Sequence, residues 1–226
     1  MVGTSHDSAI HGLDAGSGNG RTGARDNSER SLDKGFAQAI LARLTRPIVL
    51  IGLMGAGKSC IGKRLASHLG LPFVDADREI EVAAGCAIPD IFSRHGEKAF
   101  RDGERRVIQR LLGNSSHVLA TGGGAFADPT TRALVKERGL SVWLRADLDL
   151  LLKRVLRRND RPLLHNVDPR AKLAELIELR HPHYAEANII VDSADGPPEV
   201  TLGRVLEALH QHLLQEPGNR GEDASS

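Results

Sequence analysis

Aromatic residues and net charge are both scarce in this sequence. Only 3% of its 226 residues are aromatic, and the formal net charge is +1. Proteins that bind single-stranded nucleic acid stack bases on aromatic side chains, and proteins that bind duplexes present a strongly basic surface. Because the chain has neither feature, we expect no nucleic-acid partner.

Cysteines and long apolar runs are scarce as well. Cys60 and Cys86 form no C-x-x-C pair, which argues against a zinc site or a disulfide framework, and we expect two reduced thiols. No apolar run approaches the roughly 20 residues that cross a bilayer. The N-terminus lacks the apolar core of a signal peptide. These absences predict a cytoplasmic protein with no membrane partner.

Composition divides the chain into a working domain and polar ends. Residues 1–30 are rich in Gly, Ser, Asp, Asn and Arg, and we expect a disordered extension, because such a segment buries too little surface to offset its ordering entropy. Residues 31–45 read as a short helix or linker, with Phe36, Ile40 and Leu44 at helical spacing. The domain should then span residues 46–214, and residues 215–226 form a second disordered tail.

Five short apolar runs within the domain predict β-strands. They cover residues 48–51, 73–74, 118–120, 141–144 and 188–191. Between them, apolar residues recur every three or four positions, as in Ile61, Leu65 and Leu69, which predicts helices. Strands that alternate with helices favour an α/β fold of three αβα layers around a parallel five-stranded sheet. Ligands of such folds bind beyond the carboxyl ends of the strands.

The segment from Gly52 to Ser59 matches the phosphate-loop pattern G-x-x-x-x-G-K-[ST]. It follows a predicted buried strand and begins an amphipathic helix. This context favours a phosphate loop over the alternative, a glycine-rich turn that matches the pattern by chance. Backbone N–H groups of such a loop surround a polyphosphate, Lys58 bridges the β- and γ-phosphates, and Ser59 holds Mg²⁺. The residues of the loop that we expect to bind ATP are Gly55, Ala56, Gly57, Lys58, Ser59 and Cys60.

Features outside the phosphate loop indicate which class of nucleotide-binding protein this is. The chain has no N/T-K-x-D motif for reading a guanine base, and it is short for a large ATPase. A small phosphate-loop domain with an arginine-bearing segment between two helices is typical of a metabolite kinase.

Two carboxylates follow the strand at 73–74, which we expect to lie next to the phosphate-loop strand. Asp75 could hold Mg²⁺ through water, and Asp77 could accept a hydrogen bond from a substrate hydroxyl and take its proton. The alternative is that Asp77 only caps the helix that follows it. Two aspartates beside a phosphate loop favour the functional interpretation.

The next motif resembles a known family. Shikimate kinases carry F-x-x-x-G-E-x-x-F-R-x-x-E after a D-x-D, and the chain has it intact at Phe92, Gly96, Glu97, Phe100, Arg101 and Glu104. One helical turn separates Arg101 from Glu104, so that the glutamate can orient the guanidinium while its outer edge faces a substrate carboxylate. A surface ion pair is the alternative for an isolated pair of this kind.

Three further segments extend the resemblance. Gly122–Gly124 follow the strand at 118–120, and in the family this stretch contacts the substrate, chiefly at Gly123. Arg161 begins the family's R-P-L-L in a segment (about 157–168) that we expect to be a mobile lid, and it would reach the transferred phosphate. Arg154, seven residues earlier, would pack on adenine, and Arg180 begins R-x-P-x-Y and would bind the substrate carboxylate together with Arg101.

The resemblance covers residues 46–210 and implies a phosphate-loop kinase fold. It implies the reaction ATP + shikimate → ADP + 3-phosphoshikimate, in the synthesis of aromatic amino acids, with one Mg²⁺ per subunit. Lys58, Asp77 and Arg161 would be catalytic, Asp77, Arg101, Gly123 and Arg180 would bind the acceptor, and Ser59 and Asp75 would hold the metal. One departure is Cys60, where the family has Thr or Ser. We expect a monomer.

Two rival functions stay open at this stage. A gluconate-type sugar-acid kinase is also a small phosphate-loop domain, although the intact F-R-x-x-E and R-P-L-L segments disfavour it. An inactive relative could bind nucleotide without turnover, although Lys58, Ser59, Asp77 and Arg161 all occur together. A nucleic-acid-dependent ATPase is disfavoured by the near-neutral charge.

Overall fold

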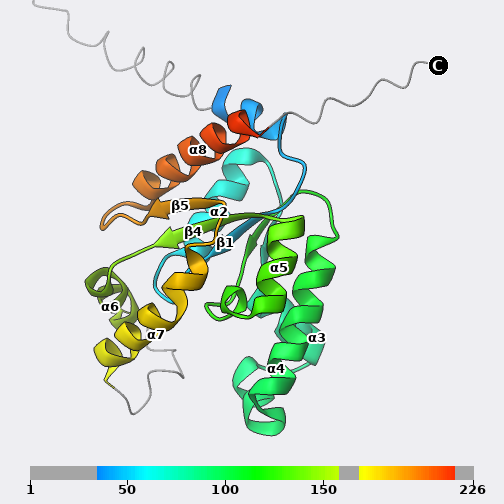
Figure 1. Ribbon diagram of the computed structural model, residues 1–226, viewed down its shortest axis with the longest axis vertical. Coiled ribbons are helices and arrows are strands. Elements are labelled where there is room, and N and C mark those ends of the chain that lie inside the picture. The colour runs from blue at the N-terminus through cyan, green and yellow to red at the C-terminus, as the bar shows by residue number, and fades with distance from the viewer. Residues whose placement is uncertain (1–34, 158–167, 217–226) are drawn as a thin grey trace, which may run out of the picture. The chain divides into compact units, whose positions relative to one another are not determined.

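The computed structural model describes residues 35–157 and 168–216 of the chain (Figure 1). The predicted extension (1–30), Arg161 with most of the predicted lid, and residues 217–226 of the predicted tail lie outside this part. Residues 35–41 form a helix, in which Ile40 is fully buried, and Leu44 is buried just after it. The limits assigned to the domain and its tails stay predictions.

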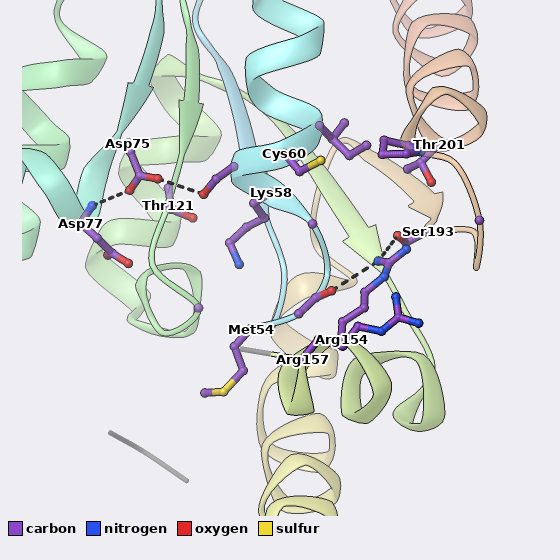
Figure 2. Close-up of a pocket in the computed structure, with 17 residues that line it drawn as sticks. Met54, Lys58, Cys60, Asp75, Asp77, Thr121, Arg154, Arg157, Ser193 and Thr201 are labelled. Carbon is purple, nitrogen blue, oxygen red and sulfur yellow. Dashed lines mark hydrogen bonds between the residues drawn. The ribbon is translucent and has the colours of Figure 1, made fainter. Parts of the chain in front are cut away.

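A five-stranded parallel sheet forms the centre of the fold, as predicted. Its strands are β1 (Ile48–Ile51), β2 (Phe73–Asp75), β3 (Val118–Ala120), β4 (Leu140–Arg145) and β5 (Ile189–Asp192). Their order is β2-β3-β1-β4-β5, and every neighbouring pair is parallel. The carboxyl ends of the strands therefore meet at one edge, where a pocket opens (Figure 2).

The expected contact between β2 and the phosphate-loop strand is wrong, because β3 lies between β1 and β2. A helical crossover such as α2 (Lys58–Leu69) is long enough to pass over one strand position, so sequence proximity does not fix adjacency. The three residues of β3 are fully buried, whereas those of β2 are half-buried and include Asp75. The more apolar strand takes the inner position, and the strand that ends in a carboxylate takes the edge.

Helices cover both faces of the sheet (Figure 1). On one face, α2 packs against α8 (Pro198–Gln215). The other helices are α3 (Ala76–Ala84), α4 (Ile88–Leu112, bent at Gly96), the 3-10 turn η1 (Ala125–Ala127), α5 (Pro129–Arg138), α6 (Leu148–Leu156) and α7 (Pro169–Tyr184). Of these, α5 and α4 pack together, and α7 contacts α6 and η1. No helix within residues 35–157 and 168–216 is long and apolar enough to cross a membrane.

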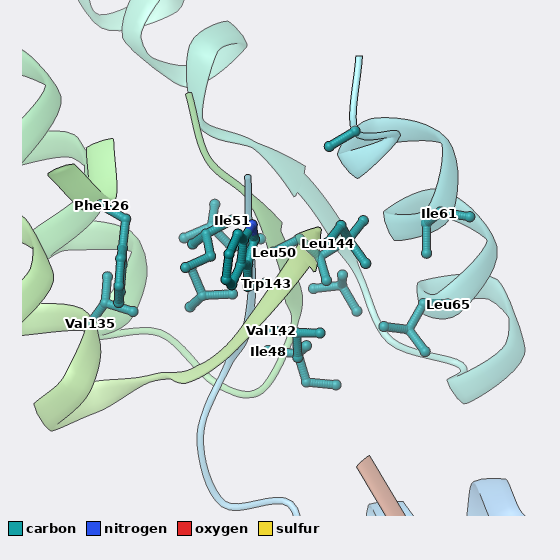
Figure 3. Close-up of a cluster of buried hydrophobic side chains, with 14 of the residues drawn as sticks. Ile48, Leu50, Ile51, Ile61, Leu65, Phe126, Val135, Val142, Trp143 and Leu144 are labelled. Atoms are coloured by element: carbon teal, nitrogen blue, oxygen red, sulfur yellow. The ribbon is translucent and has the colours of Figure 1, made fainter. Parts of the chain in front are cut away.

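Successive side chains of the central strands point to opposite faces of the sheet and contribute to two apolar layers (Figure 3). Toward α2, side chains of the sheet meet Ile61 and Leu65, and the sheet residues of this layer include Ile48, Leu50, Val142 and Leu144. Toward α5, Ile51 and Trp143 meet Phe126 and Val135. Both faces of β1 are buried, which is why its sequence is continuously apolar rather than alternating.

Two helix glycines provide a matched test of the packing on α2. A Cβ at Gly62 would lie 2.6 Å from the Phe73 ring and 3.1 Å from Leu50 Cδ1, whereas a Cβ at Gly203, on the exposed side of α8, would meet nothing within 4 Å. We expect Gly203→Ala to raise stability by about 0.5–1 kcal/mol through helix propensity. Gly62→Ala should lower stability by about 1–3 kcal/mol through overpacking. Thermal unfolding of both variants checks this; a gain for Gly62→Ala would contradict the tight α2–sheet contact.

Candidate active site

A pocket of 610 Å³ opens at the carboxyl edge of the sheet (Figure 2). It is lined by the phosphate loop, by the aspartate that ends β2 and the aspartate two residues later, by the glycine segment after β3 and by residues after β5. Its charged side chains are Lys58, Asp75, Asp77, Arg154 and Arg157. The acids lie on one side of Lys58 and the two arginines on the other (Figure 2).

The phosphate loop has the backbone that polyphosphate binding needs. Gly57, just before α2, has φ 101°, a conformation that side chains with a Cβ rarely adopt, and it turns the chain into the N-terminus of the helix. Lys58 Nζ donates to the carbonyl oxygens of Gly52 (2.7 Å) and Leu53 (3.0 Å), which holds the ammonium over the loop. The loop backbone is therefore compatible with polyphosphate binding, and the contacts of these residues with ATP stay predictions.

Asp75 links the phosphate loop to the acid side of the pocket. Its Oδ2 accepts a hydrogen bond from Ser59 Oγ at 2.9 Å, and its Oδ1 accepts one from the backbone N–H of Asp77 at 3.2 Å. Asp75 is thus the N-cap of α3, and the alternative that Asp77 merely caps this helix does not hold. The Asp77 carboxylate is left to face the pocket (Figure 2).

The pKa of Asp77 is raised above the ordinary value of an aspartate. Loss of surrounding water is the main cause, and the neighbouring Asp75 carboxylate adds to it, while Lys58 and Arg101 oppose it. Asp77 is exposed by surface area, but it lies in a concave site where protein replaces much of the water around the carboxylate. A carboxylate of this kind accepts a proton more readily than one in free solution.

Arg101 is held by glutamates on its own helix. Its Nη1 donates to Glu104 Oε2 at 2.7 Å and its Nη2 to Glu97 Oε1 at 3.3 Å. Glu104 is 1% exposed while Arg101 is half-buried, so this is not a surface ion pair, and burial raises the pKa of Glu104 despite the bond to Arg101. The two terminal nitrogens of the guanidinium lie against Gly124, where an added Cβ would be 2.7 Å from both of them.

Arg180 reaches the neighbouring glycine from α7. Its Nη1 donates to the Gly123 carbonyl at 3.0 Å, and the Tyr184 hydroxyl donates to the same oxygen. On the other side of the segment, a Cβ at Gly122 would lie 2.8 Å from Asp77 Oδ1. The side chains of Asp77, Arg180 and Arg101 thus lie against three consecutive glycines, in that order. The glycine segment brings together the residues that the sequence predicted for the acceptor site.

Arg154 ties the far side of the phosphate loop to the segment after β5. Its Nη1 donates to the carbonyls of Gly55 and Ala56 (both 3.3 Å) and to Ser193 Oγ (2.8 Å), and its Nη2 donates to the Ala194 carbonyl (2.6 Å). The guanidinium thus lies in the predicted nucleotide half of the pocket, where its stacking on adenine stays a prediction.

Some site residues escaped the sequence analysis. Ser193, directly after β5, and Thr201, in the first turn of α8, line the pocket, and Tyr184 was part of a quoted motif without a role. The signal for the first two is their position beyond a strand's carboxyl end. Cys60 lines the pocket, and its Sγ accepts a hydrogen bond from Arg64 Nη1 at 3.1 Å, while its contact with ATP stays a prediction. Arg161 lies outside the described residues.

Comparison with known proteins assigns the family. A family model described as "Shikimate kinase" matches residues 54–210, well over half of the chain. The chain belongs to the shikimate kinase family. A shikimate kinase of Paramagnetospirillum magneticum is 59% identical over 178 residues, which cover 79% of this chain and 91% of that relative. A shikimate kinase of Rhodopseudomonas palustris is 53% identical over 181 residues, covering 80% and 89%.

Solved structures support the shikimate kinase assignment. "Shikimate kinase from Acinetobacter baumannii in complex with shikimate" superposes with a TM-score of 0.70 at 38% identity and covers 77% of this chain and 95% of that chain. The resemblance drawn from the motifs is therefore confirmed, and so is the phosphate-loop kinase fold of the shikimate kinases.

The raised pKa of Asp77 predicts how the stability of an Asp77 variant depends on pH. Because the folded chain raises the pKa of Asp77, the ionised carboxylate destabilises the fold at neutral pH. We expect Asp77→Asn to raise the melting temperature at pH 7–8. The gain should shrink as pH falls through the raised pKa and vanish below the ordinary aspartate pKa of about 3.9, where the folded and unfolded chains both carry a protonated carboxyl group.

Asp128 is the matched control with the opposite sign. Burial alone would raise the pKa of Asp128, but hydrogen bonds from Thr131 and the charge of Arg105 outweigh it and lower the pKa. Asp128→Asn should therefore lower the melting temperature at neutral pH, with a loss that fades as pH falls through that lowered pKa. Melting curves across pH check both signs, and a destabilised Asp77→Asn at pH 7–8 would refute the environment assigned to Asp77.

Proposed function

We propose that the chain transfers the γ-phosphoryl group of ATP to the 3-hydroxyl of shikimate and releases ADP and 3-phosphoshikimate. Membership of the shikimate kinase family supports the reaction. The observation that carries the residue roles is the segment Gly122–Gly124. It lies against Asp77, Arg180 and Arg101 in turn, and a Cβ on its middle residue would be 3.5 Å from the phosphate-loop nitrogen of Met54. An acceptor on this segment therefore lies beside the phosphate loop.

The two arginines explain why the acceptor is an acid. The guanidinium groups of Arg180 and Arg101 lie against successive glycines and repel each other. A carboxylate that accepts hydrogen bonds from both groups relieves this repulsion. A charge-assisted pair also fixes the orientation of the ring that carries the reacting hydroxyl. Asp77 then accepts the hydrogen bond of that hydroxyl, and its raised pKa suits it to take the proton as the oxygen attacks phosphorus.

The residues of the nucleotide half supply positive charge and backbone donors. Lys58 is aimed over the loop by its bonds to Gly52 and Leu53, and the N-terminus of α2 faces the phosphates. Arg161 would arrive with the lid and stabilise charge on the transferred group, a role taken from the family resemblance.

The oxygen atoms next to the loop fit a magnesium ion. Ser59 Oγ and Asp75 Oδ2 are 2.9 Å apart, and Mg²⁺ prefers oxygen ligands, usually with only one or two from protein and the rest from phosphates and water. Ser59 would bind the ion directly and Asp75 through water. When bound, the ion neutralises charge on the phosphates.

The first test is ADP release with Mg-ATP and a panel of acceptors: shikimate, quinate, gluconate and none. Turnover strongly favouring shikimate is the expected result. Turnover on gluconate alone would keep a kinase and overturn the acceptor assignment. Tight ATP binding without turnover on any acceptor would favour an inactive relative.

A second test addresses the carboxylate clamp. Arg180→Ala removes a charge-assisted hydrogen bond, so KM for shikimate should rise by about 10- to 100-fold while KM for ATP stays within about twofold. Lys172→Ala is the matched control, because it removes a cation from the same helix whose partner is Glu175 on the surface. Equal losses for both substrates in Arg180→Ala would rule out the clamp.

A further inference from the structure

Tyr184 is a buried polar residue that the reaction scheme above does not use. It is the last residue of α7, one helical turn after Arg180, and is 1% exposed. Its hydroxyl donates to the Gly123 carbonyl, and Arg180 Nη1 donates to the same oxygen at 3.0 Å. Both side chains of this turn thus end on one atom of the segment that lies beside Asp77 and Arg101.

The side chains around the Tyr184 ring keep its hydroxyl directed at the Gly123 carbonyl. The Trp143 ring lies 5.7 Å and the His181 ring 6.2 Å from the Tyr184 ring, so the phenol has little freedom to turn away. Burial raises the pKa of Tyr184 to about 12, although the nearby Arg180 guanidinium lowers it. The phenol therefore stays protonated and remains a hydrogen-bond donor at any physiological pH.

A carbonyl oxygen has two lone pairs, and here Tyr184 and Arg180 take one each. With the carbonyl fixed by the rigid phenol, the bond from Nη1 fixes the plane of the guanidinium as well. The remaining N–H groups of Arg180 then have a defined direction in which to receive an anion. Without the phenol, the glycine peptide would depend on a flexible arginine alone.

We propose that Tyr184 is a positioning residue for the acceptor: through the Gly123 carbonyl it fixes both the glycine segment and the Arg180 guanidinium in the arrangement that binds the acceptor's carboxylate. This inference rests on the proposed function, because it concerns the same acceptor site. It assigns Tyr184 no contact with the acceptor and no part in proton transfer.

Tyr184→Phe isolates the hydroxyl, because the ring and its packing are kept. We expect KM for shikimate, and its dissociation constant by calorimetry, to rise by roughly 3- to 20-fold, the usual effect of one lost hydrogen bond to a buried group. KM for ATP and kcat at saturating shikimate should stay within about twofold, because the Tyr184 hydroxyl bonds to the Gly123 carbonyl and, among the described residues, to no group of the phosphate loop or of Asp77.

Leu209→Ala is the control for a purely structural role. It removes buried side-chain volume from α8 and leaves Tyr184 and the rings beside it unchanged, so it should lower the melting temperature without raising KM for shikimate. A rise in KM that follows the loss of stability in both variants alike would overturn the proposal. Wild-type affinity for shikimate in Tyr184→Phe would overturn it as well.

A double-mutant cycle tests whether Tyr184 acts through Arg180. In an Arg180→Ala background, adding Tyr184→Phe should cost much less affinity for shikimate than it does in the wild type. Fully additive losses would contradict positioning through Arg180. Failure of the wild type to use shikimate would instead refute the proposed function, so the two failures are distinguishable.

Discussion

The carbonyl oxygen of Leu50 is the atom on which the layout of the site depends. It accepts hydrogen bonds from the backbone N–H (3.2 Å) and the hydroxyl (3.1 Å) of Thr121, inside the buried sheet. These two hydrogen bonds to one acceptor extend the pairing of β1 with β3 one residue beyond the end of β3. It anchors the glycine segment directly beside the start of the phosphate loop, so the acceptor and nucleotide halves share one rigid base.

The position of β3 between β1 and β2 then makes room for a substrate. If β2 paired with β1, Asp75 and Asp77 would adjoin the phosphate loop and leave no place for a glycine segment between them. With β3 in the inner position, the segment passes between the acids and the loop. Asp75 still spans the gap, because its two oxygens bind Ser59 on one side and the Asp77 backbone on the other.

Much of this could be predicted from sequence where the physics is local. Each of the five strands contains a short apolar run, and the phosphate loop is a contiguous pattern with a fixed backbone requirement. Strand order was not predictable in the same way, since the α2 crossover permits β2 to pair with β1 or to skip one position. That is why the expected neighbour of the phosphate-loop strand was wrong although every strand was found.

Contacts between distant segments set a second limit. Arg154 lies 98 residues from Ala56, and Tyr184 lies 61 residues from Gly123, so neither partner follows from periodicity or spacing. The choice of cap at α3 was equally hidden, because Asp75 and Asp77 are both good N-cap residues and only the start of the helix decides between them. Family resemblance supplied roles for several of these residues, but it did not supply their partners.

The burial of Glu104 beneath Arg101 has a consequence for selectivity. A guanidinium clamped on one side by a 1%-exposed carboxylate cannot swing out to follow a poorly placed ligand, so its outer edge is presented in a single orientation. A neutral polyol that entered the site would strip water from two cations and return no charge. If these two arginines bind the acceptor as proposed, the site would select against uncharged sugars through the cost of desolvation.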